Sequence, residues 1–449
     1  MKLNIKKNIE RGLLLLVFLL PFNFRHIFNF ASTQDIQYFK ENLQYSLFAF
    51  DIVFLITLFF WLLKKKTAKI NWAFILLATY LVANSLIVSP DPNTSLYNSL
   101  RFVEVLIFFL IIISVTYSQK FFKKTLYVIF ISGVFQSAIA LLQFAFQKSL
   151  GLKYLGESVL SPQIPGVAKL SLPGEKLIRA YGTFPHPNTL GAFLFMSLIA
   201  GLYFALKRDW KIPFSFPQKS KVLRLKKKTK RLLGKIHFTI GLALIFTGTV
   251  AAFSRSVWLV TALLTIVLVL ELFIFNKYRF KSVFKSVFLT IFILGSAFFL
   301  FREFIPARLC AGNCQDESLT LRQDYSQFSQ KIIVSNPLTG IGIGQFVPVF
   351  KEKNPSNLEN WDLQPVHNFY LIAWSETGLI GFILIFFFFF NKFNFANPIP
   401  CLETRLFFFL ASGFLILGLF DHYFWTLPQG QFIFWLSLAL FVASGKINE

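Results

Sequence analysis

Apolar runs of about 20 residues recur along most of the chain and alternate with short polar segments. Runs of that length cross the hydrocarbon core of a bilayer as helices. The pattern predicts an all-α polytopic integral membrane protein with about twelve transmembrane helices, in which residues 1–449 form a single membrane domain. The predicted spans are 10–25, 45–63, 70–89, 97–117, 125–147, 187–206, 236–253, 257–275, 286–304, 368–390, 404–421 and 429–445.

Composition agrees with this pattern and excludes two other classes of protein. Of the 449 residues, 55% are hydrophobic and only 15% are charged, whereas an average globular chain is about 25% charged. A mean hydropathy of +0.60 excludes intrinsic disorder, which needs low hydrophobicity. It also argues against a soluble enzyme, because one water-facing domain cannot hide so much apolar surface. The 61 Phe side chains are expected mostly to face lipid.

The net charge of +24 suggests a polyanionic partner such as nucleic acid, but its position along the chain gives a different interpretation. With the N-terminus inside, 30 of the 45 Lys and Arg lie on inner segments, as the positive-inside rule requires. The densest basic block, 224-RLKKKTKR-231, falls in the predicted cytoplasmic loop 207–235. We interpret it as a topology signal that contacts anionic membrane lipid. The sequence therefore predicts the inner (cytoplasmic) membrane, cytoplasmic termini and no nucleic-acid partner.

Two predicted extracytoplasmic loops, 148–186 and 302–367, are long enough to carry chemistry. The second separates the ninth and tenth spans. The first ends in 179-RAYGTFPHPNTLGAF-193, where Arg179 and His186 approach the bilayer. Charged groups there are costly unless they are used. The alternative is that the stretch only starts a helix, with Asn188 as its N-cap after Pro187.

Three further stretches are candidates for a binding site. Arg255, in the tight outer turn 253-FSRSVWL-259, can grip a phosphate through bidentate hydrogen bonds or snorkel to headgroups. The glycines of 340-GIGIG-344 predict a backbone turn or an anion-binding nest.

The tenth span opens on His367-Asn368 and contains Glu376. A carboxylate inside a span is a functional candidate, and an ion pair with an inward Arg is the alternative. In the fourth span, Arg101 and Glu104 are three residues apart and are predicted to pair with each other.

The cysteines predict no metal site. Cys310 and Cys314 fall in the outer loop 302–367, where oxidising conditions permit a small disulfide, and Cys401 is expected to be a free thiol on the inner side. No neighbouring histidine or second cysteine pair completes a zinc ligand set. No cofactor is predicted, because no nucleotide-binding motif occurs.

Four outer stretches, in chain order, resemble the O-antigen ligase and O-antigen polymerase superfamily, the membrane glycosyltransferases that share the Wzy-type C-terminal domain. They are 179-RAYGTFPHPNTLG-191, 254-SRSVWL-259, 335-SNPLTGIGIGQF-346 and 367-HNFYLIAWSETGLIG-381. The closing 421-DHYFWTLPQGQFIFW-435 is similar to the end of the family sequence. The resemblance spans residues 179–435, implies a GT-C-like helical fold and places an O-antigen ligase-like core at 179–390 that includes the 302–367 loop.

The resemblance implies a metal-independent glycosyltransferase. Its donor is a polyprenyl-pyrophosphate-linked glycan and its acceptor is a hydroxyl on a lipid- or glycan-linked molecule, at the extracytoplasmic face. Matched motif by motif, Arg179, Arg255 and Arg322 bind the pyrophosphate, and His367 acts on the acceptor hydroxyl. The residues expected to support them are His186, Asn188, Asn368 and Glu376. Pyrophosphate is already a good leaving group, so guanidinium groups can replace a metal ion, and a neutral imidazole can serve as base.

Three alternatives remain open at the level of the sequence. Ligase and polymerase belong to the same superfamily and are not distinguished. A transporter or flippase of lipid-linked glycans would show paired halves and polar sites at the bilayer midplane, whereas the polar residues here gather at outer helix ends. A scaffolding protein would not need Arg and His at several separate outer turns.

Overall fold

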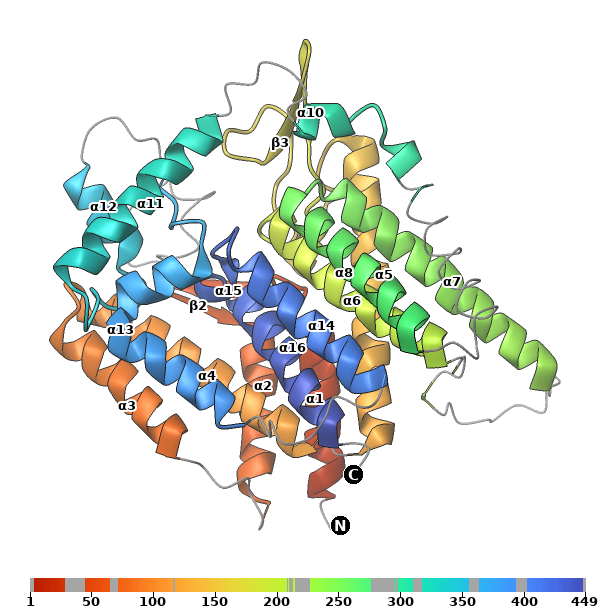
Figure 1. The fold of residues 1–449 in the computed structure, drawn as a ribbon, viewed down its shortest axis with the longest axis horizontal. Coiled ribbons are helices and arrows are strands. Elements are labelled where there is room, and N and C mark those ends of the chain that lie inside the picture. The colour runs from red at the N-terminus through yellow and green to blue at the C-terminus, as the bar shows by residue number, and fades with distance from the viewer. Residues whose placement is uncertain are drawn as a thin grey trace.

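The computed structural model is dominated by helices (Figure 1). It describes residues 4–28, 45–64, 72–115, 118–207, 209, 213–214, 227–275, 295, 298–309, 317–354, 363–392 and 402–446. Every predicted span that falls in these residues contains a helix. The predicted 286–304 span lies mostly outside them, as do Cys310, Cys314 and Cys401.

The longer helices follow the apolar runs of the sequence. They are α1 (Ile5–Leu19), α2 (Ala49–Leu62), α3 (Trp72–Ile87), α4 (Pro92–Val115), α5 (Gln119–Phe146), α6 (Pro187–Lys207), α7 (Lys227–Ala251), α8 (Arg255–Phe275), α11 (Glu317–Ser335), α13 (Phe369–Phe390), α14 (Leu402–Leu417) and α16 (Pro428–Lys446). Four shorter helical segments join them, namely η3 (Lys153–Leu155), α10 (Ile305–Leu309), α12 (Phe346–Lys353) and α15 (Tyr423–Thr426).

Five of the described helices are long and apolar enough to cross a membrane. They are α4, α5, α6, α13 and the Arg231–Ala251 part of α7. Shorter apolar helices occupy Ala49–Leu62, Trp72–Ile87 and Arg255–Val267. The chain is therefore a polytopic helical membrane protein, and the total of twelve spans stays a prediction from the sequence.

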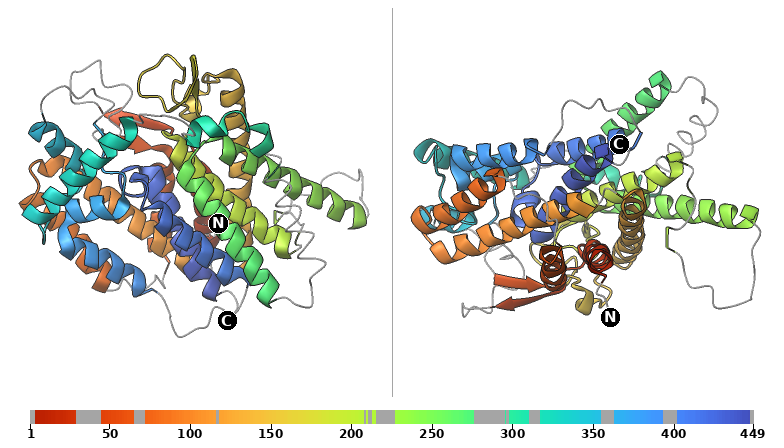
Figure 2. Two further views of the ribbon diagram at one scale, coloured as in Figure 1. Left: turned by 45° about the horizontal axis from the view of Figure 1, so that its top comes forward. Right: turned by 90° about the horizontal axis from the view of Figure 1, so that it is seen from below.

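Two groups of helices flank a central pair. On one side α3 packs against α4 and α13, and on the other α5 packs against α6 and α7. Between them α16 contacts α4 and α14, while α14 contacts α6 and α8, as the views in Figures 1 and 2 show. Both chain ends lie at one end of the bundle, whereas α10, α11 and α12 lie toward the opposite end (Figure 1).

In the part of the chain that the structure describes, two antiparallel hairpins interrupt the predicted all-helical pattern. Strand β1 (Arg25–Phe28) pairs with β2 (Tyr45–Phe48), and β3 (Lys169–Leu172) pairs with β4 (Glu175–Ile178). The predicted span 45–63 was therefore wrong at its start, since its first four residues are extended. An apolar run of this length does not separate a strand from a helix.

Aromatic side chains fill the helix interfaces. More of the described Phe side chains are buried than exposed, so the expectation that they mostly face lipid was wrong. At the contact of α4 with α16, for example, Phe109 meets Trp435 edge to face with ring centroids 5.3 Å apart. Aromatic pairs of this kind are stable when offset or T-shaped, which suits the packing of wide helix interfaces.

The predicted pair on α4 is confirmed. Arg101 Nη1 donates to Glu104 Oε2 at 2.9 Å, and the same atom lies 2.7 Å from Asp51 Oδ1 on α2. Arg101 also donates to the Ser46 carbonyl, so the guanidinium attaches the β1–β2 hairpin to the bundle.

Candidate functional site

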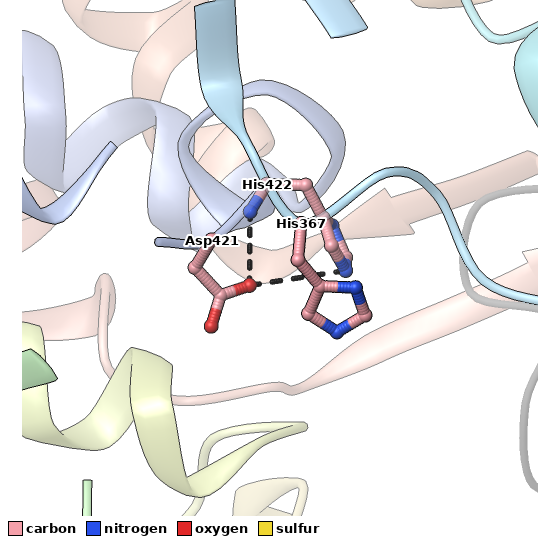
Figure 3. Close-up of side chains that lie close together, drawn as sticks. All are labelled: His367, Asp421 and His422. Atoms are coloured by element: carbon pink, nitrogen blue, oxygen red, sulfur yellow. Dashed lines mark hydrogen bonds and ion pairs between the residues drawn. The ribbon is translucent and has the colours of Figure 1, made fainter. Parts of the chain in front are cut away.

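His367, Asp421 and His422 form a cluster that joins two loops (Figure 3). His367 precedes α13, and the other two residues lie between α14 and α15. The imidazole rings of His367 and His422 meet edge to face with centroids 5.0 Å apart. Asn368 is the N-cap of α13, as its Oδ1 accepts from the backbone N–H of Tyr370 and of Leu371 at 2.9 and 3.0 Å.

Asn368 also holds the two loops together. Its Nδ2 donates to the Leu419 carbonyl at 3.2 Å, and the neighbouring Phe369 N–H donates to the Gly418 carbonyl at 2.7 Å. These bonds fix the chain just before Asp421 against the start of α13. Asn368 therefore supports the cluster through the backbone rather than by facing a ligand.

A polar chain connects this cluster to the predicted Arg179 stretch. The buried Asp421 accepts a hydrogen bond from Asn188 Nδ2 on Oδ2 at 2.6 Å and one from the His422 N–H on Oδ1 at 2.9 Å. Asn188 Oδ1 in turn accepts from Arg179 Nη2 at 2.6 Å. Residues 233 positions apart in sequence are thus joined directly.

The prediction that Asn188 caps its helix was wrong. Helix α6 begins at Pro187, and the carbonyl of His186 accepts from the backbone N–H of Thr189 and of Leu190. Proline is favoured at the first helical position, since its fixed φ suits the helix and it lacks the unsatisfied N–H. The side chain of Asn188 is therefore available to bridge Arg179 and Asp421.

Arg179 is buried against the turn that precedes α8. Its Nε donates to the Ala252 carbonyl at 3.0 Å, and Arg308 of α10 donates through Nε to the next carbonyl, that of Phe253, at 2.7 Å. Arg255 is half-buried and begins α8 immediately after this turn. The turn therefore brings two arginines together, and the role of Arg255 toward a pyrophosphate stays a prediction.

Positive charge dominates this part of the site. Burial, followed by the nearby charge of Arg308, lowers the pKa of Arg179, and Arg322 of α11 acts in the same direction. A guanidinium nevertheless stays protonated in proteins. Arg308 and Arg322 thus both act on Arg179, and the buried Asp421 lies within electrostatic reach of Arg179 and of Arg322. An added anion would relieve the mutual repulsion of these guanidinium groups.

The histidines, by contrast, are held neutral. Burial and then the charge of Arg179 lower the pKa of His186 to about 3, and its Nδ1 accepts from the Asn188 N–H at 3.1 Å. Burial likewise lowers the pKa of His367 well below its usual value, and His422 adds to that effect. Burial alone would raise the pKa of Asp421, but His422, the other two histidines and Arg322 together lower it to about 2.

These shifts predict the pH dependence of any reaction that uses a site histidine as base. Since the pKa of His367 and of His186 lies below the ordinary imidazole value of 6.5, both stay neutral where a solvated imidazole would be protonated. The rate should stay level as the pH falls through 6.5 and decline only at lower pH. The stability of the fold should also decrease with falling pH, but its decrease begins at about pH 6.5, because below that pH the unfolded chain binds more protons than the folded chain. A rate profile with its midpoint near 6.5 would contradict the buried, neutral site.

One group of side chains in the described part of the protein has the composition of a metal site. The ligand atoms of His367, Asp421 and His422 lie within 4.8 Å of one another, and three protein ligands are typical of catalytic zinc. However, Asp421 already accepts from Asn188, and Arg322 adds a positive charge. Both features favour an anion over a divalent cation at this point.

The glycine turn at 340–344 does not face this cluster as an open nest. Its N–H groups are directed at α13, with Ile341 N donating to the Ser375 carbonyl at 3.0 Å and Gly342 N to the Glu376 carbonyl at 2.8 Å. The Glu376 side chain accepts from Phe346 N and from Trp425 Nε1. Among the described residues it forms no ion pair, so the alternative of an inward Arg partner is not what the structure shows.

The structure thus groups most of the predicted site residues and adds three. Arg179, His186, Asn188, Arg322 and His367 surround one region. Sequence reasoning assigned no role to Asp421, His422 and Arg308. The adjacent polar pair at 421–422 between two apolar spans was a signal for the first two, and Arg308 had none.

Comparison with known proteins gives one family. Residues 240–386, about a third of the chain, match the sequence model of a family described as O-antigen ligase, the Wzy-type C-terminal domain. The match runs from α7 through most of α13 and includes Arg255, Arg322, His367 and Glu376. No curated protein matches the chain.

Proposed function

We propose that this chain, whose residues 240–386 match the O-antigen ligase family, belongs to the O-antigen ligase and polymerase superfamily. In this proposal it transfers a glycan from a polyprenyl-pyrophosphate donor to an acceptor hydroxyl at the extracytoplasmic face of the cytoplasmic membrane. One observation carries the proposal. Buried Arg179 has Arg308 and Arg322 within electrostatic reach. Hydrogen bonds through Asn188 connect Arg179 to Asp421, which lies beside the neutral imidazole of His367. An anion site and a base thus lie side by side.

The arginines supply what the donor needs. As the glycosidic bond to phosphate breaks, negative charge grows on the leaving pyrophosphate. Guanidinium groups stabilise such charge through charge-assisted, often bidentate, hydrogen bonds. Arg179 is already oriented by Ala252 and Asn188, so little reorganisation is needed when the charge develops.

His367 supplies what the acceptor needs. Its buried Nδ1 forms no hydrogen bond with any described residue, so this nitrogen has no protein partner to give up when an acceptor hydroxyl is placed against it. In the proposed step the acceptor oxygen forms a bond to the anomeric carbon, and the bond from that carbon to phosphate breaks. Polyprenyl pyrophosphate leaves with the electron pair, and the hydroxyl proton passes to the imidazole.

The placement of the site supports its proposed sidedness. Arg308 belongs to α10, and Arg322 belongs to α11, both toward the end of the bundle opposite the two chain termini (Figure 1). If the termini are cytoplasmic, as the charge distribution predicts, the site opens to the outer leaflet, where a flipped lipid-linked glycan is found.

A defined assay tests the proposal and separates it from transport. Purified protein is supplied with a polyprenyl-pyrophosphate oligosaccharide in chelator-containing buffer, with and without a separate lipid- or glycan-linked acceptor. We expect release of polyprenyl pyrophosphate together with a new glycosidic bond. A ladder of longer lipid-linked glycans identifies a polymerase, and a single transfer to the separate acceptor identifies a ligase. No turnover with any such donor would contradict the proposal and favour a transporter.

A further inference from the structure

Helix α13 is broken two residues after Glu376. Gly378 has φ +64, and an added Cβ there would lie 2.2 Å from the Leu338 carbonyl oxygen. Around this break the turn that follows α11 replaces the hydrogen bonds of the helix. The N–H groups of Leu379 and Ile380 donate to Pro337 and Leu338, at 2.9 and 3.2 Å. The α11 turn is thereby locked to the interior of α13.

The carboxylate of Glu376 adds two more elements to this junction. It is 2% exposed. Its Oε1 accepts from the N–H of Phe346, the first residue of α12, at 3.1 Å, and its Oε2 accepts from the indole Nε1 of Trp425 in α15 at 2.7 Å. The backbone of Gly344 also bonds to it. One internal carboxyl group therefore occupies the glycine turn and ties it to α15.

Three of the elements joined at this junction carry or adjoin part of the candidate site. Helix α11, whose following turn bonds to α13 just after Glu376, carries Arg322. Helix α13 begins two residues after His367, and α15 directly follows Asp421 and His422. The hydrogen bonds of this one side chain therefore connect elements that lead directly to the candidate site.

We propose that Glu376 is a positioning residue that sets the arrangement of Arg322, His367 and the Asp421–His422 pair by accepting hydrogen bonds from α12 and α15 at once. The inference rests on the proposed function for its activity readout. The reason for a carboxylate, rather than a neutral isostere, is that both side-chain atoms must accept. A glutamine offers one acceptor and places its NH₂ against an N–H.

The acceptor requirement predicts a rescue. Glu376→Gln should lower the transfer rate about tenfold or more, because a buried donor is left unsatisfied. Trp425→Phe removes the indole donor that faces the amide. The double variant should therefore transfer faster than Glu376→Gln alone. Trp61→Phe is the matched control, since its indole donates to the Ser114 hydroxyl at 3.0 Å, away from this junction, and it should give no rescue.

Three measurements decide the proposal. The rate of transfer at saturating donor and acceptor tests the rescue, and its pH profile should keep the wild-type midpoint in every variant. Thermal melting of the purified protein, which needs no substrate, should show the same coupling between positions 376 and 425. A wild-type rate in Glu376→Gln, equal rates with and without Trp425→Phe, or a shifted pH midpoint would overturn the positioning role.

The failure of this proposal is distinguishable from failure of the proposed function. If the wild-type protein turns over no lipid-linked donor, the function is wrong, and the melting cycle still tests the junction. If Glu376→Gln does not fold, Trp425→Phe alone is tested, because it leaves one oxygen of the buried carboxylate without its donor. It should lower both the melting temperature and the rate, and unchanged values of both would overturn the inference.

Discussion

His367→Ala is expected to abolish glycan transfer while the protein still inserts and folds. The imidazole is the group of the site whose unpartnered nitrogen can take the hydroxyl proton, and a positioned general base contributes about 10²- to 10⁴-fold. Folding should survive because His367 lies in the loop before α13, and Asn368 keeps the cap of that helix. The measurement is the initial rate of transfer from a polyprenyl-pyrophosphate oligosaccharide to its acceptor.

His237→Ala provides a matched control. His237 is a histidine of α7 whose Nε2 lies 3.3 Å from the Tyr127 hydroxyl, and it is no part of the cluster at His367. Its variant should transfer at close to the wild-type rate. Full activity of His367→Ala would remove the proposed base and would direct attention to His422, whose ring is the nearest second imidazole.

The helices could be predicted from the sequence because a bilayer imposes a length on every apolar run. Ends of helices were less predictable. Helix α1, for example, begins at Ile5, five residues before the predicted span, because the helix extends beyond the apolar run at its N-terminal end and includes Lys6 and Lys7. The hairpin of β1 with β2 was missed because strand Tyr45–Phe48 and the start of a helix share the same apolar composition.

The candidate site was partly predictable for a related reason. Charged residues near the bilayer are rare, so Arg179 and His367 were conspicuous in the sequence. The local sequence pattern could not predict that these residues come together, because the site depends on a hydrogen bond between Asn188 and Asp421, which are 233 residues apart. Asp421 itself was read as the last residue of an apolar span, whereas α14 ends at Leu417. The residues between the end of α14 and the start of α15 therefore form a loop, and this loop places Asp421 and His422 in the site.

Arg179→Lys is expected to raise the KM for the lipid-linked donor even though the charge is kept. The guanidinium donates through Nε to Ala252 and through Nη2 to Asn188. A lysine ammonium is a single point and cannot hold both partners while facing a pyrophosphate. We expect a donor KM about tenfold higher for Arg179→Lys and higher still for Arg179→Ala, since charge-assisted hydrogen bonds contribute about 1.5–3 kcal/mol each. The KM for the acceptor should change little. Initial rates across donor concentration measure both constants.

The choice of control determines what the Arg179 result means. Arg302→Ala removes another arginine, one that is exposed and whose guanidinium lies over the Phe299 ring at 4.5 Å, so it should leave the donor KM unchanged. If the donor KM is the same in Arg179→Ala and the wild type, Arg179 binds no pyrophosphate. The buried Arg179–Asn188–Asp421 chain would then serve only to hold α6 against the loop before α15. A raised donor KM with a wild-type acceptor KM requires that the charge on Arg179 meets the leaving group, because a purely structural loss would affect both substrates.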